Sequence, residues 1–277
     1  MASPLHCRPK LRLLCVALAF VLAVDVGRAD IYKDIQIIWS ADHTYYFMDG
    51  DSEALALSLD FNRGSAFKSN DMYLFARIDI DIKLVEGNSA GTVCTVYTIS
   101  EGPWDIHDEI DLEFLGNSTG EPYTLHTNVF AYGVGGREQQ FKLWFDPSAD
   151  YHTYSIVWNP KRITIEVDGV TIRTFDNNED QGVPFPSWQQ QRGDWSLAPF
   201  VSYYRNYNIT YCRPSPGVSG CGAEPAGSPL FNLSPKARAD LQWVRYMGYV
   251  LYDYCTDRSN RYTDATRPKE CSLPPRP

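Results

Sequence analysis

The segment from His107 to Asn117 reads HDEIDLEFLGN. Acidic residues occupy every second position in its centre: Glu109, Asp111 and Glu113. The positions between and after them are apolar: Ile110, Leu112 and Phe114. Because successive side chains of a β-strand point to opposite faces, this alternation predicts a strand with one apolar face in a core and three carboxylates on an open face.

Carboxylates at this spacing repel one another, so the pattern is unfavourable for folding alone and indicates a function. Retaining glycoside hydrolysis uses two carboxyl groups about 5–5.5 Å apart, one as nucleophile and one as acid/base. The Cα atoms of Glu109 and Glu113 would lie about 13 Å apart, a gap that long side chains and sheet twist can largely close. A hydrogen bond or shared proton with Asp111 would keep Glu109 ionised and oriented. The crowded negative charge would favour the protonated form of Glu113, which an acid catalyst requires.

The spacing leaves two other interpretations open. Clustered carboxylates also suit a calcium ion on a lectin-like sheet. They could equally form a solvated acidic face with no chemical role.

The composition is that of a globular chain and excludes one class of partner. The 277 residues include 25 Lys and Arg and 34 Asp and Glu, for a formal charge of −9 at pH 7. This length fits one large β domain or two small ones. The acidic balance argues against nucleic acid, which is bound by a basic face. Aromatic residues make up 14% of the chain, a high value that the fold or the function has to explain.

Residues 1–29 have the features of a secretory signal peptide. Basic residues precede an apolar run from Leu13 to Val24, and small residues stand at Gly27 and Ala29, the two positions that a signal peptidase reads. An uncleaved membrane anchor is the alternative, but the run is short for a membrane span and Asp25 follows at once. We therefore expect a secreted protein with no membrane segment after cleavage.

The cysteines divide into three groups. Cys7 and Cys15 are removed with the signal peptide, and Cys94 stands in an apolar run, where a buried small hydrophobe is expected. Four more lie in the last third of the chain: Cys212, Cys221, Cys255 and Cys271. In an oxidising compartment they predict two disulfides. Three pairings exist, and local loops favour Cys212–Cys221 and Cys255–Cys271. A zinc site is the alternative, without a C-x-x-C spacing or a nearby His to support it.

Strand periodicity runs through most of the chain. The expected strands are 55–59, 73–84, 92–99, 109–115, 123–130, 139–145, 151–158, 162–167 and 170–175. Asp168-Gly169 is a strong hairpin signal between the last two, and the spacing of the strands indicates a sandwich or a barrel. Ser234 and Pro235 predict the start of one helix over about 236–245, and a further strand is expected over 246–254.

The segment 107–117 resembles the active-site motif H-D-E-I-D-F-E-F-L-G-N of the plant xyloglucan endotransglucosylase/hydrolases, in glycoside hydrolase family 16. Other segments resemble the same family: GNSAGTV (87–93), LHTNVF (125–130), REQQFKLWFDP (137–147), YHTYSIVWNP (151–160), GVPFP (182–186), DWSLAPF (194–200), YDYCTD (252–257) and ECS (270–272). Together these segments extend over nearly all of residues 31–277.

The resemblance implies a fold and a division into domains. The fold is an all-β jelly-roll sandwich with an open concave cleft, followed by a short C-terminal extension of one helix and one strand. The parts are the signal peptide at 1–29, the family 16 catalytic domain at 30–211 and the disulfide-stapled extension at 212–277.

The resemblance also implies roles for single residues. Glu109 matches the nucleophile, Asp111 the orienting residue and Glu113 the acid/base. The residues expected to contact the glucan are Glu113, His126, Thr127, Asn128, Gly136, Arg137, Glu138 and Arg261. Asn117 matches the family's glycosylation site, and Asn208 and Asn232 begin two further acceptor sequences. The four late cysteines match the family's two disulfides in the pairing favoured above. No metal and no cofactor is expected.

The activity implied is that of a secreted enzyme of the cell wall or apoplast. It would cleave the β-1,4-glucan backbone of xyloglucan by double displacement and transfer the glycosyl-enzyme to another xyloglucan end or to water. The partners are then a donor and an acceptor polysaccharide, and the chain is expected to be a monomer. Aromatic rings that cover flat sugar faces, together with the sandwich core, would explain the aromatic content.

Three features depart from the family pattern. Residues 102–107 contain two extra residues ahead of the catalytic His, in a loop at the rim of the cleft. Gly136 stands where the family usually has Asn or Asp. Residues 187–192 replace a segment about twenty residues longer, which would include an inner strand with aromatic and acidic groups of the acceptor side. The alternative function is therefore a catalytically impaired xyloglucan-binding protein, or a misfolded product of a faulty gene model.

Overall fold

The computed structural model describes residues 30–186, 202–211, 233–259, 261–263 and 265–276. The predicted signal peptide, the shortened segment at 187–192, the Cys212–Cys221 pair and Asn232 lie outside these residues. Within them, no helix has the length and apolar character that crossing a bilayer requires.

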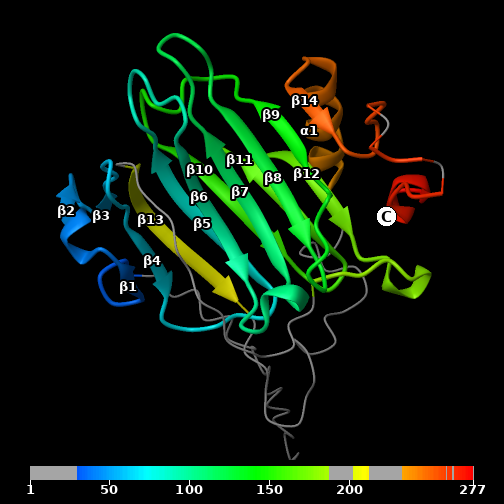
Figure 1. The fold of residues 1–277 in the computed structure, drawn as a ribbon, viewed down its shortest axis with the longest axis horizontal. Helices are drawn as coiled ribbons and strands as arrows, with labels where there is room; N and C mark the ends of the chain where they lie inside the picture. Colours follow the sequence, from blue (N-terminus) through cyan, green and yellow to red (C-terminus); the bar gives the residue numbers. More distant parts are fainter. Residues whose placement is uncertain (1–29, 187–201, 212–232, 260, 264, 277) are drawn as a thin grey trace, which may run out of the picture.

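Two antiparallel sheets account for most of the described chain (Figure 1). The larger has seven strands in the order β12-β11-β10-β5-β13-β3-β2, the smaller has five in the order β14-β9-β8-β7-β6, and β1 pairs with β4 in a separate ribbon. The strands are β1 (Ile35–Trp39), β2 (Thr44–Asp49), β3 (Ser52–Leu57), β4 (Ala66–Ser69), β5 (Ala76–Lys83), β6 (Val93–Ile99), β7 (Glu109–Leu115), β8 (Thr124–Phe130), β9 (Gln139–Lys142), β10 (His152–Trp158), β11 (Arg162–Val167), β12 (Val170–Asp176), β13 (Ser202–Tyr211) and β14 (Val250–Asp253). With one α-helix beside them, these sheets confirm the predicted all-β sandwich class.

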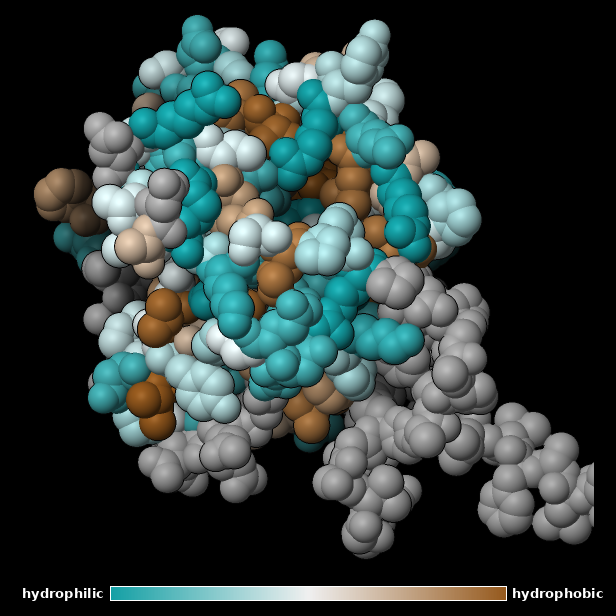
Figure 2. Space-filling view, turned by 90° about the vertical axis from the view of Figure 1, so that its right-hand side faces the viewer, coloured by the Kyte–Doolittle hydropathy of each residue, from teal (hydrophilic) through white to brown (hydrophobic). Residues whose placement is uncertain are grey.

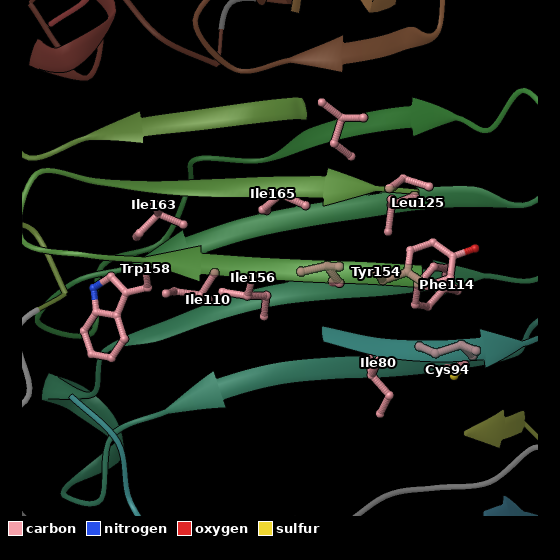
Figure 3. Close-up of a cluster of buried hydrophobic side chains, with 14 of the residues drawn as sticks. Ile80, Cys94, Ile110, Phe114, Leu125, Tyr154, Ile156, Trp158, Ile163 and Ile165 are labelled. Atoms are coloured by element: carbon pink, nitrogen blue, oxygen red, sulfur yellow. The ribbon is translucent and has the colours of Figure 1, made fainter. Parts of the chain in front are cut away.

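The core lies between the two sheets and contains the apolar face of β7. Ile110, Leu112 and Phe114 are each almost completely buried, as the alternation predicts. The ring of Phe114 meets that of Tyr154, from β10 of the other sheet, edge to face at 4.6 Å (Figure 3). Complete burial of each such side chain contributes on the order of 1.5–3 kcal/mol, so β7 is held firmly against the larger sheet.

Local sequence signals placed most of the strands within a few residues. The bounds of β7 and β11 are those predicted, and the Asp168-Gly169 turn joins β11 to β12 with both residues at positive φ, as a tight hairpin turn requires. β1, β2, β4 and β13 were not predicted. In β13 the alternation is broken by Asn206, which has a φ of 50°, and the pairing with β5 shifts register between Arg205 and Asn208.

The helix of the C-terminal extension is α1 (Pro235–Tyr246), close to the prediction. The Ser234 side chain accepts a hydrogen bond from the backbone of Ala237 at 3.0 Å and caps the helix. The strand expected over 246–254 is shorter, because Gly248, with a φ of 72°, turns the chain before β14 begins at Val250.

The extension adds to the edges of both sheets. β14 pairs with β9 at the edge of the five-stranded sheet. At the end of the β11–β12 hairpin, Asp240 of α1 accepts a hydrogen bond from the backbone of Thr171. Cys255 and Cys271 form the predicted disulfide, and Cys94 is a buried free thiol, also as predicted. The face on the right-hand side of Figure 1 has a largely hydrophilic surface, with small hydrophobic areas between the polar side chains (Figure 2).

Candidate active site

The three acidic residues of β7 project from the face of the five-stranded sheet that is turned away from the core. β7 lies between β6 and β8, so each carboxylate has one neighbour on either side. These cross-strand sets are Ile99–Glu109–Phe130, Tyr97–Asp111–Asn128 and Thr95–Glu113–His126. Cross-strand neighbours on one face are in contact distance, so the register decides the surroundings of each acid.

The three carboxylates differ in their access to water. Glu109 and Asp111 are each only 8% exposed, whereas the Glu113 side chain is 37% exposed. Two of the three acids are therefore taken out of solvent, which contradicts the interpretation as a solvated acidic face. The described residues also contain no group of three or more His, Cys, Asp or Glu side chains arranged to hold a metal ion, so they give the calcium interpretation no support.

Glu109 and Asp111 share a hydrogen bond and a proton. Burial raises the pKa of Asp111 to about 9, and the negative charge of Glu109 adds to this effect. Burial also raises the pKa of Glu109, but the hydrogen bond with Asp111 and the neighbouring His107 act in the opposite direction. The hydrogen bond itself lowers the pKa of Glu109 and raises that of Asp111, so within the pair Asp111 is the proton donor and Glu109 the acceptor. This arrangement agrees with the shared proton expected from the spacing.

His107 lies against Glu109; the sequence analysis placed it in the active-site motif but assigned it no role of its own. Its ring is buried, and its Nε2 atom lies 2.9 Å from Glu109 Oε2. The ring is stacked against Trp104 at 4.3 Å and lies 5.1 Å from Phe130. The sequence contained the signal for His107, because alternation continued two positions back from Glu109 points to the same face of the sheet.

Glu113 has a histidine beside it at its open end. His126 Nε2 lies 3.6 Å from Glu113 Oε2. The Nδ1 atom of His126 is 3.0 Å from the side-chain amide nitrogen of Gln140 on β9, which donates to it. With Nδ1 as acceptor, the neutral ring carries its proton on Nε2, directed towards the carboxylate. His126 therefore belongs to the surroundings of the predicted acid/base.

The predicted triplet His126-Thr127-Asn128 is split between the two faces of β8. Asn128 lies beside Asp111, and its Oδ1 atom accepts from the backbone of Arg137 at 3.1 Å. Thr127 is completely buried on the core face, where its hydroxyl donates to the Gln139 carbonyl at 3.0 Å. The structure therefore does not bring the Thr127 side chain to the carboxylates, because adjacent strand residues point in opposite directions.

Arg173 is a buried cation beneath this part of the sheet, and the sequence analysis missed it. It lies on β12 of the other sheet, and its NH1 group donates to Thr127 Oγ1 at 2.7 Å. NH2 donates to the carbonyl of Arg137. Burial lowers the pKa of Arg173, while the charge of Asp111 is among those that raise it. No local pattern marks such a residue, since it lies 62 positions from Asp111 in the sequence and in a different sheet.

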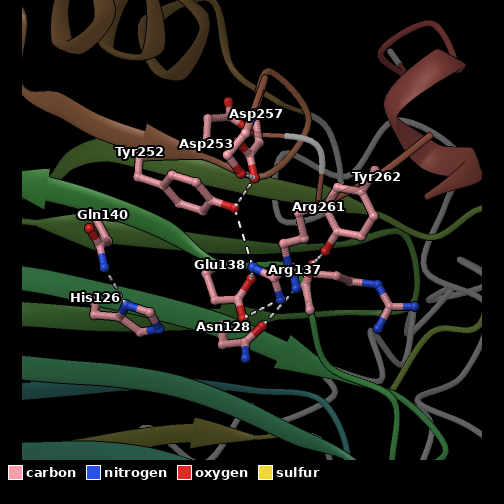
Figure 4. Close-up of polar contacts among 12 residues, drawn as sticks. His126, Asn128, Arg137, Glu138, Gln140, Tyr252, Asp253, Asp257, Arg261 and Tyr262 are labelled. Atoms are coloured by element: carbon pink, nitrogen blue, oxygen red, sulfur yellow. Dashed lines mark hydrogen bonds and ion pairs between the residues drawn. The ribbon is translucent and has the colours of Figure 1, made fainter. Parts of the chain in front are cut away.

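The remaining predicted contacts lie where the loop before β9 meets the C-terminal extension (Figure 4). Gly136, with a φ of 80°, offers its carbonyl to the Tyr262 hydroxyl at 2.7 Å. Both oxygens of Glu138 accept from Arg261, at 2.8 and 3.0 Å. Arg137 is buried and paired with Glu270 at 2.8 Å. The extension thus completes the polar surface beside Asn128. The charged side chains of this surface are largely paired across the boundary between the extension and the loop before β9.

The sequons have different surroundings. Asn117 is half-buried just after β7, and its amide donates to the Pro122 carbonyl at 3.2 Å. Asn208 lies within β13, opposite Asp79 of β5.

Of the predicted disulfides, Cys255–Cys271 closes a loop of the extension and so keeps Glu270 close to Arg137.

Comparison with known proteins identifies relatives over most of the chain. The family model of the glycosyl hydrolases family 16 matches residues 31–199, and that of the xyloglucan endo-transglycosylase (XET) C-terminus matches residues 224–271. The chain is 43% identical over 281 residues to xyloglucan endotransglucosylase protein 1 of Diospyros kaki, covering 94% of this chain and 93% of that protein. It is 44% identical over 272 residues to the probable xyloglucan endotransglucosylase/hydrolase protein 16 of Arabidopsis thaliana, covering 88% of this chain and 91% of that protein.

Proposed function

The chain belongs to the glycosyl hydrolases family 16, among the xyloglucan endotransglucosylase/hydrolases, and on this basis we propose a retaining transfer reaction on xyloglucan. The chain would cleave the β-1,4-glucan backbone of one xyloglucan molecule and transfer the cleaved end to another, or to water. The observation that carries the proposal is the graded burial of three carboxylates on one strand, with a proton shared by the two that are buried.

The first half of the reaction uses all three acids. Ionised Glu109 attacks the anomeric carbon of a backbone glucose, and Glu113 donates a proton to the departing glycosidic oxygen. Cleavage leaves a glucosyl ester on Glu109 and a free hydroxyl on the departing chain. Asp111 keeps its proton and directs it towards Glu109, a hydrogen bond that favours the ionised form of the nucleophile and orients it.

The second half reverses these roles. Glu113, now ionised, takes a proton from an incoming hydroxyl, and the oxygen of that hydroxyl displaces Glu109 from the anomeric carbon. If the hydroxyl belongs to another xyloglucan end, the product is a new polymer; if it belongs to water, the product is a shortened chain. The exposed position of Glu113 suits a carboxyl group that first donates a proton to the departing chain and then accepts one from the incoming hydroxyl.

The polar groups beside the carboxylates would hold the glucan. We assign sugar contacts to His126, Asn128, Glu138 and Arg261, which lie on or next to the carboxylate face. Gly136 and Arg137 would contribute through the backbone that carries Glu138. Thr127 would contribute indirectly, from the core face of β8. Its hydroxyl accepts from Arg173 and donates to Gln139 of β9, and so helps to fix the positions of His126 and Asn128.

We further propose that the protein acts outside the cell, in the wall. The signal-like sequence at 1–29, the sequon at Asn117 and the Cys255–Cys271 disulfide support this, because such bonds persist in oxidising compartments.

Incorporation of a labelled xyloglucan oligosaccharide into unlabelled polymer tests the activity. The chain secreted from a eukaryotic host is expected to transfer the label, and both Glu109→Gln and Glu113→Gln are expected to lose transfer by at least about a hundredfold. Glu121→Gln, an exposed acid outside the site, is the matched control and is expected to retain activity. A wild-type chain that folds cooperatively and yet neither transfers label nor releases reducing ends would overturn the proposal.

The second candidate is a binding protein that retains the glucan surface without efficient transfer. One observation favours it: among the described residues β6 is the edge strand of the five-stranded sheet, next to the catalytic strand. The loss of an inner strand from a sheet leaves an edge of this kind. Tight binding of xyloglucan with no transfer and no hydrolysis would identify this candidate, and a broad, non-cooperative melt would indicate a misfolded product.

A further inference from the structure

The loop ahead of the catalytic strand carries an exposed aromatic side chain close to the nucleophile. This loop, residues 102–107, contains the short 3-10 helix η2 (Trp104–Ile106). Trp104 is 62% exposed, and Ile106 in the same turn is 56% exposed. Large apolar side chains that remain exposed beside a reactive group call for an explanation other than packing.

Trp104 is joined to Glu109 through a single ring. One face of its indole is stacked on the His107 imidazole, with 4.3 Å between the ring centres and 17° between the ring planes. On the other side of that contact, His107 Nε2 lies 2.9 Å from Glu109 Oε2. The indole and the nucleophile therefore contact the same imidazole, the indole on a ring face and Glu109 at the Nε2 edge.

The loop is held in place by the turn after β8 and by a hydrogen bond within the loop, from His107 Nδ1 to the Trp104 carbonyl. The backbone N–H of Gly133, in the turn after β8, donates to the His107 carbonyl at 2.7 Å. A Cβ atom at Gly133 would lie 2.1 Å from the Asp105 carbonyl oxygen, so the two loops touch where only glycine fits. Tyr132 in the same turn is 52% exposed, and its backbone donates to Asp108 at 2.8 Å. A surface fixed in this way can bind a ligand at little cost in conformational entropy.

We propose that Trp104 is a sugar-binding platform for the donor chain, a contact that rests on the proposed transfer reaction. The ligand is the part of the glucan that becomes attached to Glu109. A pyranose ring presents a face of C–H groups, which packs well on an indole, and it carries no charge that this surface would have to match.

The direction of the chain follows from the order of the acids along β7. Glu113 protonates the departing oxygen, so the departing chain, and later the acceptor, lies on the Glu113 side. Trp104 and His107 lie beyond Glu109 at the opposite end of this row. A sugar on Trp104 therefore belongs to the donor portion, and the two extra residues of the loop place the platform there.

The decisive experiment measures binding in a chain that cannot turn over. In a Glu109→Gln background, Trp104→Ala is expected to raise the Kd for a xyloglucan oligosaccharide about five- to tenfold, and Trp104→Phe, which keeps a ring against His107, by less. Tyr246→Ala is the matched control, because Tyr246 is 88% exposed on α1, away from the site. The control is expected to leave the Kd unchanged.

Steady-state kinetics in the active chain separate a sugar contact from an effect passed through His107. Trp104→Ala is expected to raise the KM for the donor polymer, to leave the KM for the acceptor oligosaccharide unchanged, and to leave the pH profile of kcat in place. An altered pH profile with an unchanged donor KM and Kd would overturn the platform, as would an equal rise in both KM values. If the wild-type chain transfers label while both Trp104 variants bind the donor normally, this inference fails and the proposed function stands. If the wild-type chain neither transfers nor binds xyloglucan, both fail.

Discussion

Replacing Asp111 by Asn tests the shared proton, because it removes the titrating group and keeps a hydrogen-bond donor for Glu109. The pKa of Asp111 is about 9 in the folded chain, against an ordinary value of 3.8 that applies when the chain unfolds. Between these two values the folded chain holds one proton more than the unfolded chain. The stability contribution of this group is therefore complete below about pH 4 and is lost as the pH rises towards 9.

The size of the effect follows from the linkage of proton binding to folding. With one extra proton bound in the folded state, the free energy of unfolding falls by about 1.4 kcal/mol for each unit by which the pH rises within this window. From pH 5 to pH 7 the wild-type chain should lose about 3 kcal/mol through Asp111. The Asp111→Asn chain has no such group. The difference between its free energy of unfolding and that of the wild type should therefore shift in favour of the variant by this amount between pH 5 and pH 7.

Urea unfolding at pH 5, 6, 7 and 8 measures the difference, since the linear extrapolation gives a free energy at each pH. Glu121→Gln removes an exposed carboxyl group instead and is expected to run parallel to the wild type across the series. If the Asp111→Asn and wild-type curves also run parallel, the folded chain holds no extra proton at this position. The account of how Glu109 stays ionised would then be refuted.

Three further substitutions test the structure around the site. Cys255→Ser opens a loop closed across 16 positions and should lower the free energy of unfolding by about 3 kcal/mol. With reductant present, the wild type and the variant should unfold at the same urea midpoint, and a wild type indifferent to reductant would contradict the bond. Arg173→Met removes the donors to Thr127 Oγ1 and to the Arg137 carbonyl and should cost about 2–3 kcal/mol in the same assay, with a rise in donor KM as β8 and β9 shift; an unchanged KM would limit Arg173 to a structural role. Ser234→Ala removes the cap of α1 and should cost about 1 kcal/mol, whereas Ser234→Asp should retain most of the stability; equal loss in both would mean that the cap does not stabilise the helix.

The parts of the fold that the sequence predicted are those decided by neighbours in the chain. The strand period places Ile110 and Leu112 in the core and the acids on the opposite face, whatever the rest of the sandwich does. The Asp168-Gly169 turn and the Ser234 cap are similarly local, because each depends on a few backbone angles and one hydrogen bond.

The parts that the sequence did not predict depend on register and on contacts between sheets. The pairing of β13 shifts at Asn206, so its side chains show no steady alternation along the sequence. The place of Thr127 could have been worked out, since it lies between two residues assigned to the open face. The resemblance treated the three residues as a unit, whereas the strand divides them. Arg173 could not have been found, because its partners come from β8 of the other sheet and from the loop before β9.

The different behaviour of the three acids arises from what covers each position, not from the acids themselves. At one end of the row, the loop of residues 102–107 places His107 over Glu109, and Tyr97 from β6 lies beside Asp111. Burial raises the pKa of Tyr97 to about 12, with both carboxylates contributing, so this ring shares their low-dielectric surroundings. At the other end, Glu113 has the small, exposed Thr95 as its β6 neighbour and remains open to solvent. A strand with an alternating pattern alone would give three similar acids. The covering loop makes one end of the row a protected nucleophile and leaves the other end free to exchange protons, and Trp104 extends that same cover outwards to where the donor sugar would lie.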